Sequence, residues 1–243
     1  MKIALIGIGK WGKVLFRNLK KITNELIVLE KKKSTLINKD INWAIVSTQD
    51  HNHYKIVKKY LENKINVFCE KPITRHKLQT KELYKISEKK NVYLIENQYY
   101  FFFYKKFKFY NKKKNIVIRQ KKDKKIEIHE ILYRLAYHDL LLFYPHIKNK
   151  KLTKIEFDEF KDNKLIFNLY FNRKLVINFY YNLNNLKKNH SINNKLLKTN
   201  KNILLKYMKK VFDKKINYKE NKLRSLFIIN LLNIIEKKLK KLI

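Results

Sequence analysis

Glycine is nearly missing from this sequence, which contains 3 glycines, 2 prolines and 1 cysteine in 243 residues. At average usage, about 7 %, roughly 17 glycines would be expected. The single cysteine, Cys69, excludes an internal disulfide and a zinc site built on several cysteines. Charged residues interrupt every apolar run before the ~18 residues that a transmembrane helix needs. The first residues lack a small-residue cleavage site, so we expect no secretory signal and a cytoplasmic protein.

Acidic residues and arginine are scarce as well. The chain has 58 Lys and Arg against 20 Asp and Glu, a formal net charge of +38, and only six of the basic residues are arginine. Such a charge favours nucleic acid or an anionic membrane as the partner. Arginine, however, is the better residue for bidentate phosphate contacts. The lysines are spread along the chain, so we interpret the charge as compositional and expect no nucleic-acid or membrane partner. Nucleic-acid binding would need a contiguous lysine face.

All three glycines lie within six residues, after an apolar run at 2–6 and before a helical pattern at 11–21. In a strand–turn–helix of this kind, the first glycine permits the turn, the second lets the backbone approach a pyrophosphate, and the third lets the helix pack on the strand. The helix N-terminus then faces the phosphates. The motif predicts cofactor-binding residues Gly7, Gly9, Lys10, Trp11 and Gly12. The alternative is an ordinary strand–helix turn.

An acidic residue is expected to end the second strand of such a fold and to hold the ribose hydroxyls. Glu30 ends the apolar segment 25–30, eighteen residues after Gly12. A carboxylate there repels a 2′-phosphate, so we expect NAD as the cofactor. Lysines at 31–33 follow at once and leave NADP open. The alternative for Glu30 is a solvated strand end.

Strands and helices alternate over the first 97 residues. Buried-strand patterns lie at 43–48, 65–69 and 92–96, and helical patterns lie at 53–62 and 77–89. This alternation indicates βαβ units and a parallel sheet. We therefore predict an α/β chain whose residues 1–97 form a Rossmann domain. Only twelve residues separate the second strand from the third, so we expect the usual extra strand and helix to be trimmed.

The pattern changes after Asn97. Six aromatic residues at 99–104 precede a long helical stretch at 127–147, three period-2 strands and two final helices. The strands are expected at 152–160, 164–171 and 174–183, separated by short turns, and the helices at 201–212 and 220–241. We predict a second, α+β domain over residues 98–243, built on a mostly antiparallel sheet. The aromatic run is expected either to form core or to stack on a sugar.

Two further motifs follow the third and fourth strands. Thr48 ends one strand with His53 five residues on, and Glu70-Lys71-Pro72 ends the next. Together with the glycines, these residues resemble the glucose–fructose oxidoreductase / inositol dehydrogenase (Gfo/Idh/MocA) family. Gln49 replaces the family's proline and Asn63 a glycine. The likeness is strong over 1–97 and thinner beyond, and it indicates a shortened, divergent member.

Residues 132–143 are similar to the family's helix that carries Asp-x-Gly-x-His. His138 matches the histidine, whereas Arg134 stands at the aspartate position and Ala136 at the glycine. A guanidinium at i, i+4 would disfavour the imidazolium of His138. Either the substrate carries an acidic group that Arg134 binds, or the enzyme is impaired. We favour an anionic substrate.

The resemblance implies an NAD(P)-dependent oxidoreductase that acts on a hydroxyl or ketone of a sugar, sugar phosphate or nucleotide-sugar. It implies that Lys71 and His138 are catalytic, with Lys71 donating to the substrate oxygen and His138 moving the proton. Lys71 also binds the cofactor, together with Thr48, His53 and Glu70. Substrate residues by this resemblance are Tyr100, Arg134 and Asp139.

The resemblance also implies a homo-oligomer formed through the open sheet of the second domain. We expect no metal site, because His51 and His53 have no third ligand nearby. The bond between Lys71 and Pro72 is expected to be cis, since X-Pro is the common place for a cis peptide. The competing function is a non-catalytic dinucleotide-binding protein of the same fold. Convergence of Lys71 and His138 on the nicotinamide position would favour the enzyme.

Overall fold

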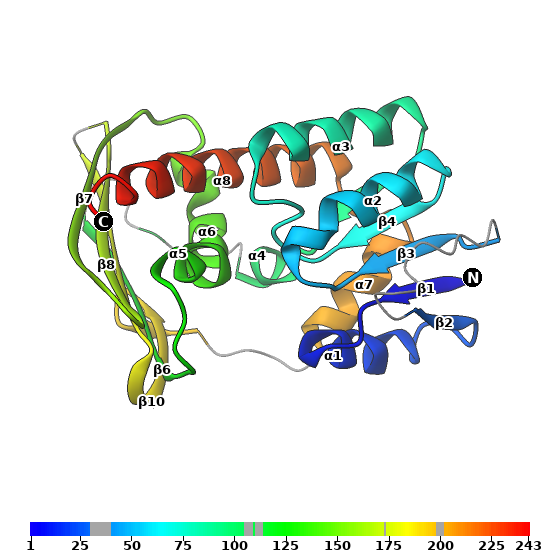
Figure 1. The fold of residues 1–243 in the computed structure, drawn as a ribbon, viewed down its shortest axis with the longest axis horizontal. Helices are drawn as coiled ribbons and strands as arrows, with labels where there is room; N and C mark the ends of the chain where they lie inside the picture. Colours follow the sequence, from blue (N-terminus) through cyan, green and yellow to red (C-terminus); the bar gives the residue numbers. More distant parts are fainter. Residues whose placement is uncertain (30–39, 105–108, 110–113, 173, 198–201) are drawn as a thin grey trace. The chain divides into compact units, whose positions relative to one another are not determined.

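The computed structural model describes residues 1–29, 40–104, 109, 114–172, 174–197 and 202–243 (Figure 1). They form two compact units, each built on its own sheet. The first comprises Met1–Phe102 with Lys201–Asn230, and the second Phe103–Asn200 with Leu231–Ile243. Among the described residues, no helix has both the length and the apolar character needed to cross a bilayer.

The first unit contains a five-stranded sheet in the order β2-β1-β3-β4-β5, with every neighbouring pair parallel. The strands are β1 (Ile3–Ile6), β2 (Leu26–Leu29), β3 (Trp43–Val46), β4 (Asn66–Cys69) and β5 (Leu94–Glu96). All residues of β1 and β3 are buried and apolar, the pattern of strands that are covered on both faces. The predicted Rossmann sheet is confirmed. Within the described residues, no strand pairs with the outer edge of β2.

Helices cover both faces of this sheet. One core cluster packs α2 (His53–Glu62) and α3 (Lys77–Lys89) against the strands, and a second cluster contains side chains of α1 (Lys10–Leu19) and α7 (Ile203–Phe212). A short 3-10 turn, η2 (Asp50–Asn52), precedes α2. The placement of α7 differs from the sequence-based division at residue 97. Its apolar face packs on residues of the first unit, which no local signal indicates.

The first turns of the last helix, α8 (Tyr218–Leu239), are hydrogen-bonded to the β5 edge of the first sheet. Asn221 is fully buried, and its amide accepts from the Glu96 backbone N–H and donates to the Glu96 carbonyl, both at 3.0 Å. One side chain therefore satisfies both backbone groups of Glu96 at the edge of β5, where the described residues pair no further strand.

The second unit contains a six-stranded mixed sheet in the order β11-β10-β6-β9-β8-β7. Its strands are β6 (Lys114–Lys122), β7 (Leu152–Lys161), β8 (Lys164–Phe171), β9 (Leu175–Asn182), β10 (Asn184–Ile192) and β11 (Lys195–Leu196). Only the β6–β9 pair is parallel, so the predicted mostly antiparallel sheet is confirmed. The sequence analysis predicted β7, β8 and β9 but missed the lysine-rich and asparagine-rich strands β6 and β10.

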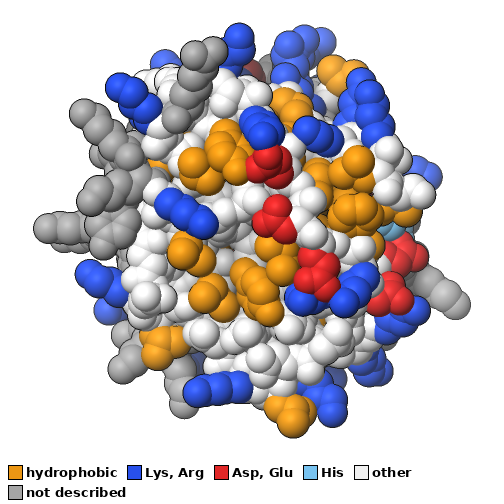
Figure 2. Space-filling view, turned by 90° about the vertical axis from the view of Figure 1, so that its left-hand side faces the viewer, with side chains coloured by type: hydrophobic (Ala, Val, Ile, Leu, Met, Phe, Trp, Pro, Cys, Tyr) orange, Lys and Arg blue, Asp and Glu red, His pale blue; other side chains and the backbone are white. Residues whose placement is uncertain are grey.

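One face of this sheet packs on a helical segment made of α5 (Ile128–Ile131), a π-helical stretch η3 (Leu132–Ala136) and α6 (Tyr137–Ile147). The aromatic run forms the short helix α4 (Tyr99–Tyr104). The opposite face of the sheet is the one that Figure 2 presents, and acidic and hydrophobic side chains lie in its middle with lysines among and around them. Outward-facing residues of β8 bond to acids of β7, as in the Asn168–Asp158 pair at 2.9 Å.

Candidate dinucleotide site

The glycine loop between β1 and α1 is shaped by two glycines and left open by the third. Gly7 has a φ of +93°, and a Cβ there would lie 2.9 Å from the Thr48 nitrogen. A Cβ on Gly12 would lie 2.2 Å from the Gly7 carbonyl oxygen. A Cβ on Gly9 would meet no atom of the described residues within 4 Å. The chain itself therefore requires glycine at two positions, whereas Gly9 borders free space at the start of α1.

The loop after β3 lies beside the glycine loop. The Ser47 hydroxyl donates to the Gly7 carbonyl at 2.7 Å, and the sheet order reverses between β1 and β3. Open α/β sheets bind ligands at the carboxyl ends of the strands around such a reversal. The hydroxyl oxygen of Thr48 is buried there and has no hydrogen-bond partner among the residues that the structure describes. A bound ligand would supply that partner, so the residues present fit a dinucleotide.

Glu70, in the loop after β4, links this loop to α1, the helix that follows the glycine loop. Its carboxylate oxygen Oε1 accepts from the Trp11 indole N–H and from the Asn97 amide at 2.6 Å. Burial raises the pKa of Glu70, although these two hydrogen bonds and the charge of Lys71 act against the rise. Lys71 itself is half-buried, and its bond to Pro72 is cis, as predicted.

Replacing Glu70 with glutamine tests this arrangement through pH. Because the pKa of Glu70 is raised in the folded state, the protonated carboxyl stabilises the wild-type protein below the ordinary value of 4.5. This contribution to the free energy of unfolding is lost as the pH rises through the folded pKa. Glutamine keeps the accepting oxygen and has no charge. We expect E70Q to gain free energy of unfolding relative to the wild type between pH 4 and neutral pH, by about 1.4 kcal/mol per unit of pKa shift. Urea unfolding across that range measures the difference in free energy of unfolding between E70Q and the wild type. A wild type that becomes more stable relative to E70Q as the pH rises would contradict the prediction.

His53 lies beneath these loops. The residue is 1 % exposed, its Nδ1 is 2.9 Å from the Pro72 carbonyl oxygen, and its Nε2 is 3.0 Å from the Thr48 carbonyl oxygen. Burial lowers the pKa of His53, against the effect of the two carbonyls. Each ring nitrogen faces a backbone carbonyl, and a neutral imidazole, which carries one N–H, donates to one of the two at a time.

The comparisons with known proteins fit this geometry. Residues 23–98 match the model of the Gfo/Idh/MocA family, an oxidoreductase family with an NAD-binding Rossmann fold. The expected resemblance to this family is confirmed. A comparison with curated proteins finds no match.

Solved dehydrogenases share the fold of the whole chain. UDP-N-acetylglucosamine 3-dehydrogenase GnnA from Acidithiobacillus ferrooxidans superposes with a TM-score of 0.75 at 12 % identity, covering 96 % of this chain and 97 % of that one. The WlbA (WbpB) dehydrogenase from Thermus thermophilus, solved with NAD and UDP-GlcNAcA, gives 0.77 at 10 % identity, with 96 % and 94 % covered. The dehydrogenase MviM from Clostridium difficile gives 0.76 at 13 %, with 98 % and 99 % covered. At these identities the likeness shows the fold alone.

Within the second unit, the segment that resembles the Gfo/Idh/MocA helix is partly π-helical. Arg134 lies in the π-helical stretch with an exposed side chain, 3.4 Å from Asp123. His138 is half-buried in the first turn of α6. Lys71 belongs to the first unit and His138 to the second, so their convergence stays a prediction.

Asp139 lies at the centre of a buried polar cluster in the second unit. It is fully buried, and its carboxylate accepts two bonds at 2.8 Å from Arg119, one at 2.9 Å from the Tyr181 hydroxyl, and one at 3.0 Å from His190. These partners come from β6, β9 and β10. A substrate could reach Asp139 only by displacing one of them, so the structure gives this residue a role in joining α6 to the sheet.

The remaining predicted residues lie near the glycine loop or outside the described residues. Tyr100 is 6 % exposed and packs edge-on against Tyr99, which stacks on Trp11 with ring centroids 5.9 Å apart. Glu30 and the lysines at 31–33 lie outside the described residues, so the ribose contact is untested. Lys10 opens α1 directly after Gly9.

Sequence analysis missed two residues of this site, Asn97 and Glu96. Asn97 donates to Glu70, and the Glu96 carboxylate is 1 % exposed and accepts from the Ile73 N–H at 3.1 Å. Both follow or end an apolar strand, which is where a parallel sheet carries its functional side chains. That position was the available signal.

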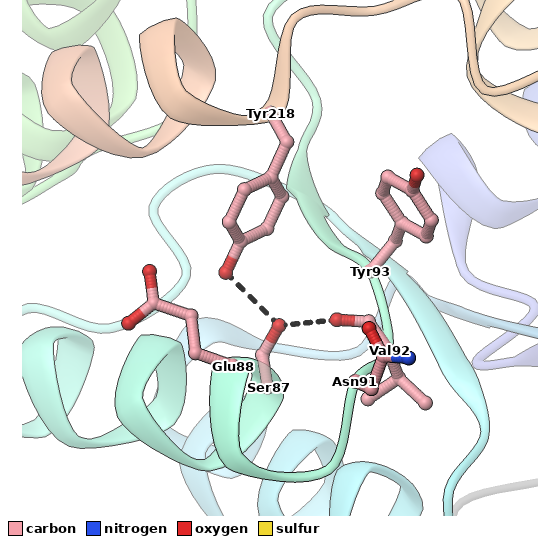
Figure 3. A pocket seen from close by; sticks show the side chains of 6 residues that line it. All are labelled: Ser87, Glu88, Asn91, Val92, Tyr93 and Tyr218. Atoms are coloured by element: carbon pink, nitrogen blue, oxygen red, sulfur yellow. Dashed lines mark hydrogen bonds between the residues drawn. The ribbon is translucent and has the colours of Figure 1, made fainter.

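A separate cavity lies at the opposite end of β5. It has a volume of about 310 Å³ and is lined by residues of the α3 C-terminus, the segment that leads into β5 and the start of α8: Ser87, Glu88, Asn91, Val92, Tyr93 and Tyr218 (Figure 3). The Tyr218 and Ser87 hydroxyls are 3.0 Å apart, and Ser87 donates to the Val92 carbonyl at 2.6 Å. None of the predicted site residues lines this cavity.

Proposed function

We propose that this protein is a nicotinamide-dependent oxidoreductase that transfers a hydride to or from the hydroxyl or ketone carbon of a sugar, sugar phosphate or nucleotide-sugar. The observation that carries the proposal is the cradle at the β1/β3 reversal. It joins a glycine loop that is open at Gly9, an unpartnered Thr48 hydroxyl, and Lys71 on the adjoining loop. The solved relatives support the substrate class, since one was crystallised with NAD and UDP-GlcNAcA.

In this proposal, different residues of the chain bind the cofactor, hold the substrate oxygen and transfer the proton. A nicotinamide dinucleotide bound in the cradle supplies the hydride chemistry. Backbone N–H groups of the glycine loop and the start of α1 hold the diphosphate. The Lys71 ammonium donates to the substrate oxygen and touches the nicotinamide ribose. His138 accepts or returns the hydroxyl proton, a step for which an imidazole suits neutral pH.

A pair of glycine variants tests the cradle. Gly9→Ala places a methyl group in open space, so we expect the free energy of unfolding to change by less than about 1 kcal/mol. The same methyl group would stand where the diphosphate backbone approaches, so we expect the affinity for NADH to fall at least tenfold. Gly12→Ala drives a Cβ into the Gly7 carbonyl at 2.2 Å and should instead destabilise the first unit.

The measurement is a fluorescence titration of the purified protein and both variants with NADH and with NADPH, beside urea unfolding. The dinucleotide that binds with the higher affinity identifies the cofactor, and we expect it to be NADH. If the wild type binds neither dinucleotide at high micromolar concentration, the proposal fails. If G9A binds NADH as tightly as the wild type, the diphosphate does not lie where we place it.

We propose an anionic substrate and a homo-oligomer on the basis of charge and of the sheet face. Arg134 presents a guanidinium on the exposed side of the π-helical stretch. The face in Figure 2 combines hydrophobic side chains with acids and lysines, so a second copy could offer complementary groups. Light scattering measures the oligomer, and turnover of UDP-sugars with and without a carboxylate measures the substrate preference.

A further inference from the structure

A single peptide group next to Lys71 is held from both ends by buried side chains. The carbonyl oxygen of Pro72 lies 2.9 Å from Nδ1 of His53, and the N–H of Ile73 donates to the Glu96 carboxylate at 3.1 Å. Both side chains belong to residues that are 1 % exposed. Two hydrogen bonds on one peptide, made in a dry environment, fix the plane of that peptide relative to α2 and β5.

His53 also reaches the loop that carries the unpartnered hydroxyl. Its Nε2 lies 3.0 Å from the Thr48 carbonyl oxygen, so one imidazole spans the loops after β3 and β4. His53 is the first residue of α2, and buried side chains of the following turns of α2 pack in the core, which holds the backbone of His53 against the sheet. The ring therefore lies between the Thr48 carbonyl and the Pro72 carbonyl of the Lys71 loop.

Glu96 is itself held firmly. Its second carboxylate oxygen accepts from the Ser225 hydroxyl at 2.7 Å and from the Gln98 amide at 3.1 Å. The carboxylate thus accepts from Ile73, Ser225 and Gln98, and α8 contributes the Ser225 donor. Because the strand ends of β3, β4 and β5 are joined through these groups, a change at His53 or Glu96 should move the Lys71 loop rather than the glycine loop.

We propose that His53 and Glu96 are positioning residues that clamp the Pro72–Ile73 peptide and thereby hold the Lys71 ammonium where it meets the substrate oxygen. The role of Lys71 in this statement rests on the proposed function. The clamp itself rests only on the contacts of the first unit. In this proposal both side chains, each on a residue that is 1 % exposed, act through the peptide and not by contact with cofactor or substrate.

Two substitutions of His53 separate its two contacts. The amide nitrogen of asparagine lies the same number of bonds from Cβ as Nδ1, and that of glutamine the same number as Nε2. His53→Asn therefore keeps a donor toward Pro72 and gives up Thr48, whereas His53→Gln does the reverse. His51→Gln is the matched control, since His51 is an exposed residue two positions earlier. Glu96→Ala removes the acceptor at the other end, and Glu96→Gln retains an oxygen for the Ile73 N–H.

The first readout is hydrogen exchange of the segment 71–76 by mass spectrometry, without any cofactor. We expect H53Q and E96A to exchange the Ile73 amide at least tenfold faster than the wild type, and H53N, E96Q and H51Q to stay within threefold. Equal exchange in H53N and H53Q would overturn the clamp. So would acceleration spread evenly over the first unit, because that result describes general loss of stability.

The second readout is the split between NADH affinity and kcat on the same proteins. For H53Q and E96A we expect kcat to fall at least tenfold while the Kd for NADH changes less than threefold, with H53N restoring most of kcat. If exchange responds as expected but kcat does not, the clamp exists without a positioning role and the proposal is overturned. If the wild type itself binds no dinucleotide, the proposed function fails, and the exchange data still decide the clamp.

Discussion

Replacing Asp139 with asparagine is expected to lower the free energy of unfolding by about 3–5 kcal/mol, because it removes one partner of a buried ionic cluster. The carboxylate is fully buried and accepts four hydrogen bonds from Arg119, Tyr181 and His190. Asparagine has nearly the same shape, so the loss would come from charge and hydrogen bonding and not from a cavity. The guanidinium of Arg119, which is only 15 % exposed, would lose the ion pair with Asp139.

The pH dependence of this loss has a definite sign. Burial acts to raise the pKa of Asp139, but the charges of Arg119 and His190 outweigh it and hold the pKa well below the usual carboxyl range. Because the pKa of Asp139 is lowered in the folded state, its carboxylate adds to the free energy of unfolding above the ordinary value of 3.8. This contribution is lost as the pH falls through the folded pKa. Urea unfolding at neutral pH and in acid should therefore show the gap between wild type and D139N shrinking in acid.

A double variant provides the control for this prediction. Changing Asp139 to leucine together with Arg119 to methionine removes both charges at once, and buried ion pairs replaced by apolar residues of similar size cost little. We expect the double variant to be more stable than D139N. A D139N protein within about 1 kcal/mol of the wild type would show that the cluster does not stabilise the second unit.

The first sheet could be predicted because its signals are local. Every strand of the Rossmann sheet is a short apolar run, and the three glycines stand at positions where the structure tolerates no side chain or leaves open space. The loop residues Thr48, Glu70 and Lys71 were predicted from their resemblance to Gfo/Idh/MocA motifs at the ends of the third and fourth strands. The cis bond before Pro72 followed from residue chemistry alone.

The second unit was predicted less completely because its determinants are distant in the chain. β10 carries Lys187, Lys188 and several asparagines without a period-2 apolar pattern, and it lies near the sheet edge, where solvent satisfies such side chains. The cluster around Asp139 joins α6 to three strands, and nothing near residue 139 indicates those partners. The π-helical turn at Leu132–Ala136 also departs from the regular helix that the pattern predicted.

The division of the chain shows the same limit. Helical periodicity predicts that residues 201–212 form a helix, and they do, but it does not say which sheet that helix covers. Tyr207 decides the matter in the structure, because its hydroxyl donates to the Glu96 carbonyl at 3.2 Å and its ring packs on Phe102. A contact across more than a hundred residues leaves no trace in a local pattern.

Lys71→Met should separate an enzyme from a non-catalytic dinucleotide-binding protein. Methionine keeps an unbranched apolar stem of similar length and removes the ammonium, so the folded state should be retained. We expect kcat on the best UDP-sugar to fall by about 10²–10⁴, the usual contribution of a positioned proton donor. The affinity for NADH should change less than tenfold, since the glycine loop supplies most of the dinucleotide contacts.

The matched control is Lys55→Met, which removes an exposed lysine from α2 and lowers the net charge by the same amount. It distinguishes loss of the Lys71 donor from a weaker overall attraction of this strongly basic protein for anionic substrates. NADH absorbance follows turnover, and fluorescence titration follows binding, on wild type and both variants. A K71M protein that turns over as fast as K55M would rule out Lys71 as a catalytic residue. A wild type that binds NADH but oxidises and reduces none of the sugars would instead favour the non-catalytic alternative, in which the cradle serves binding alone.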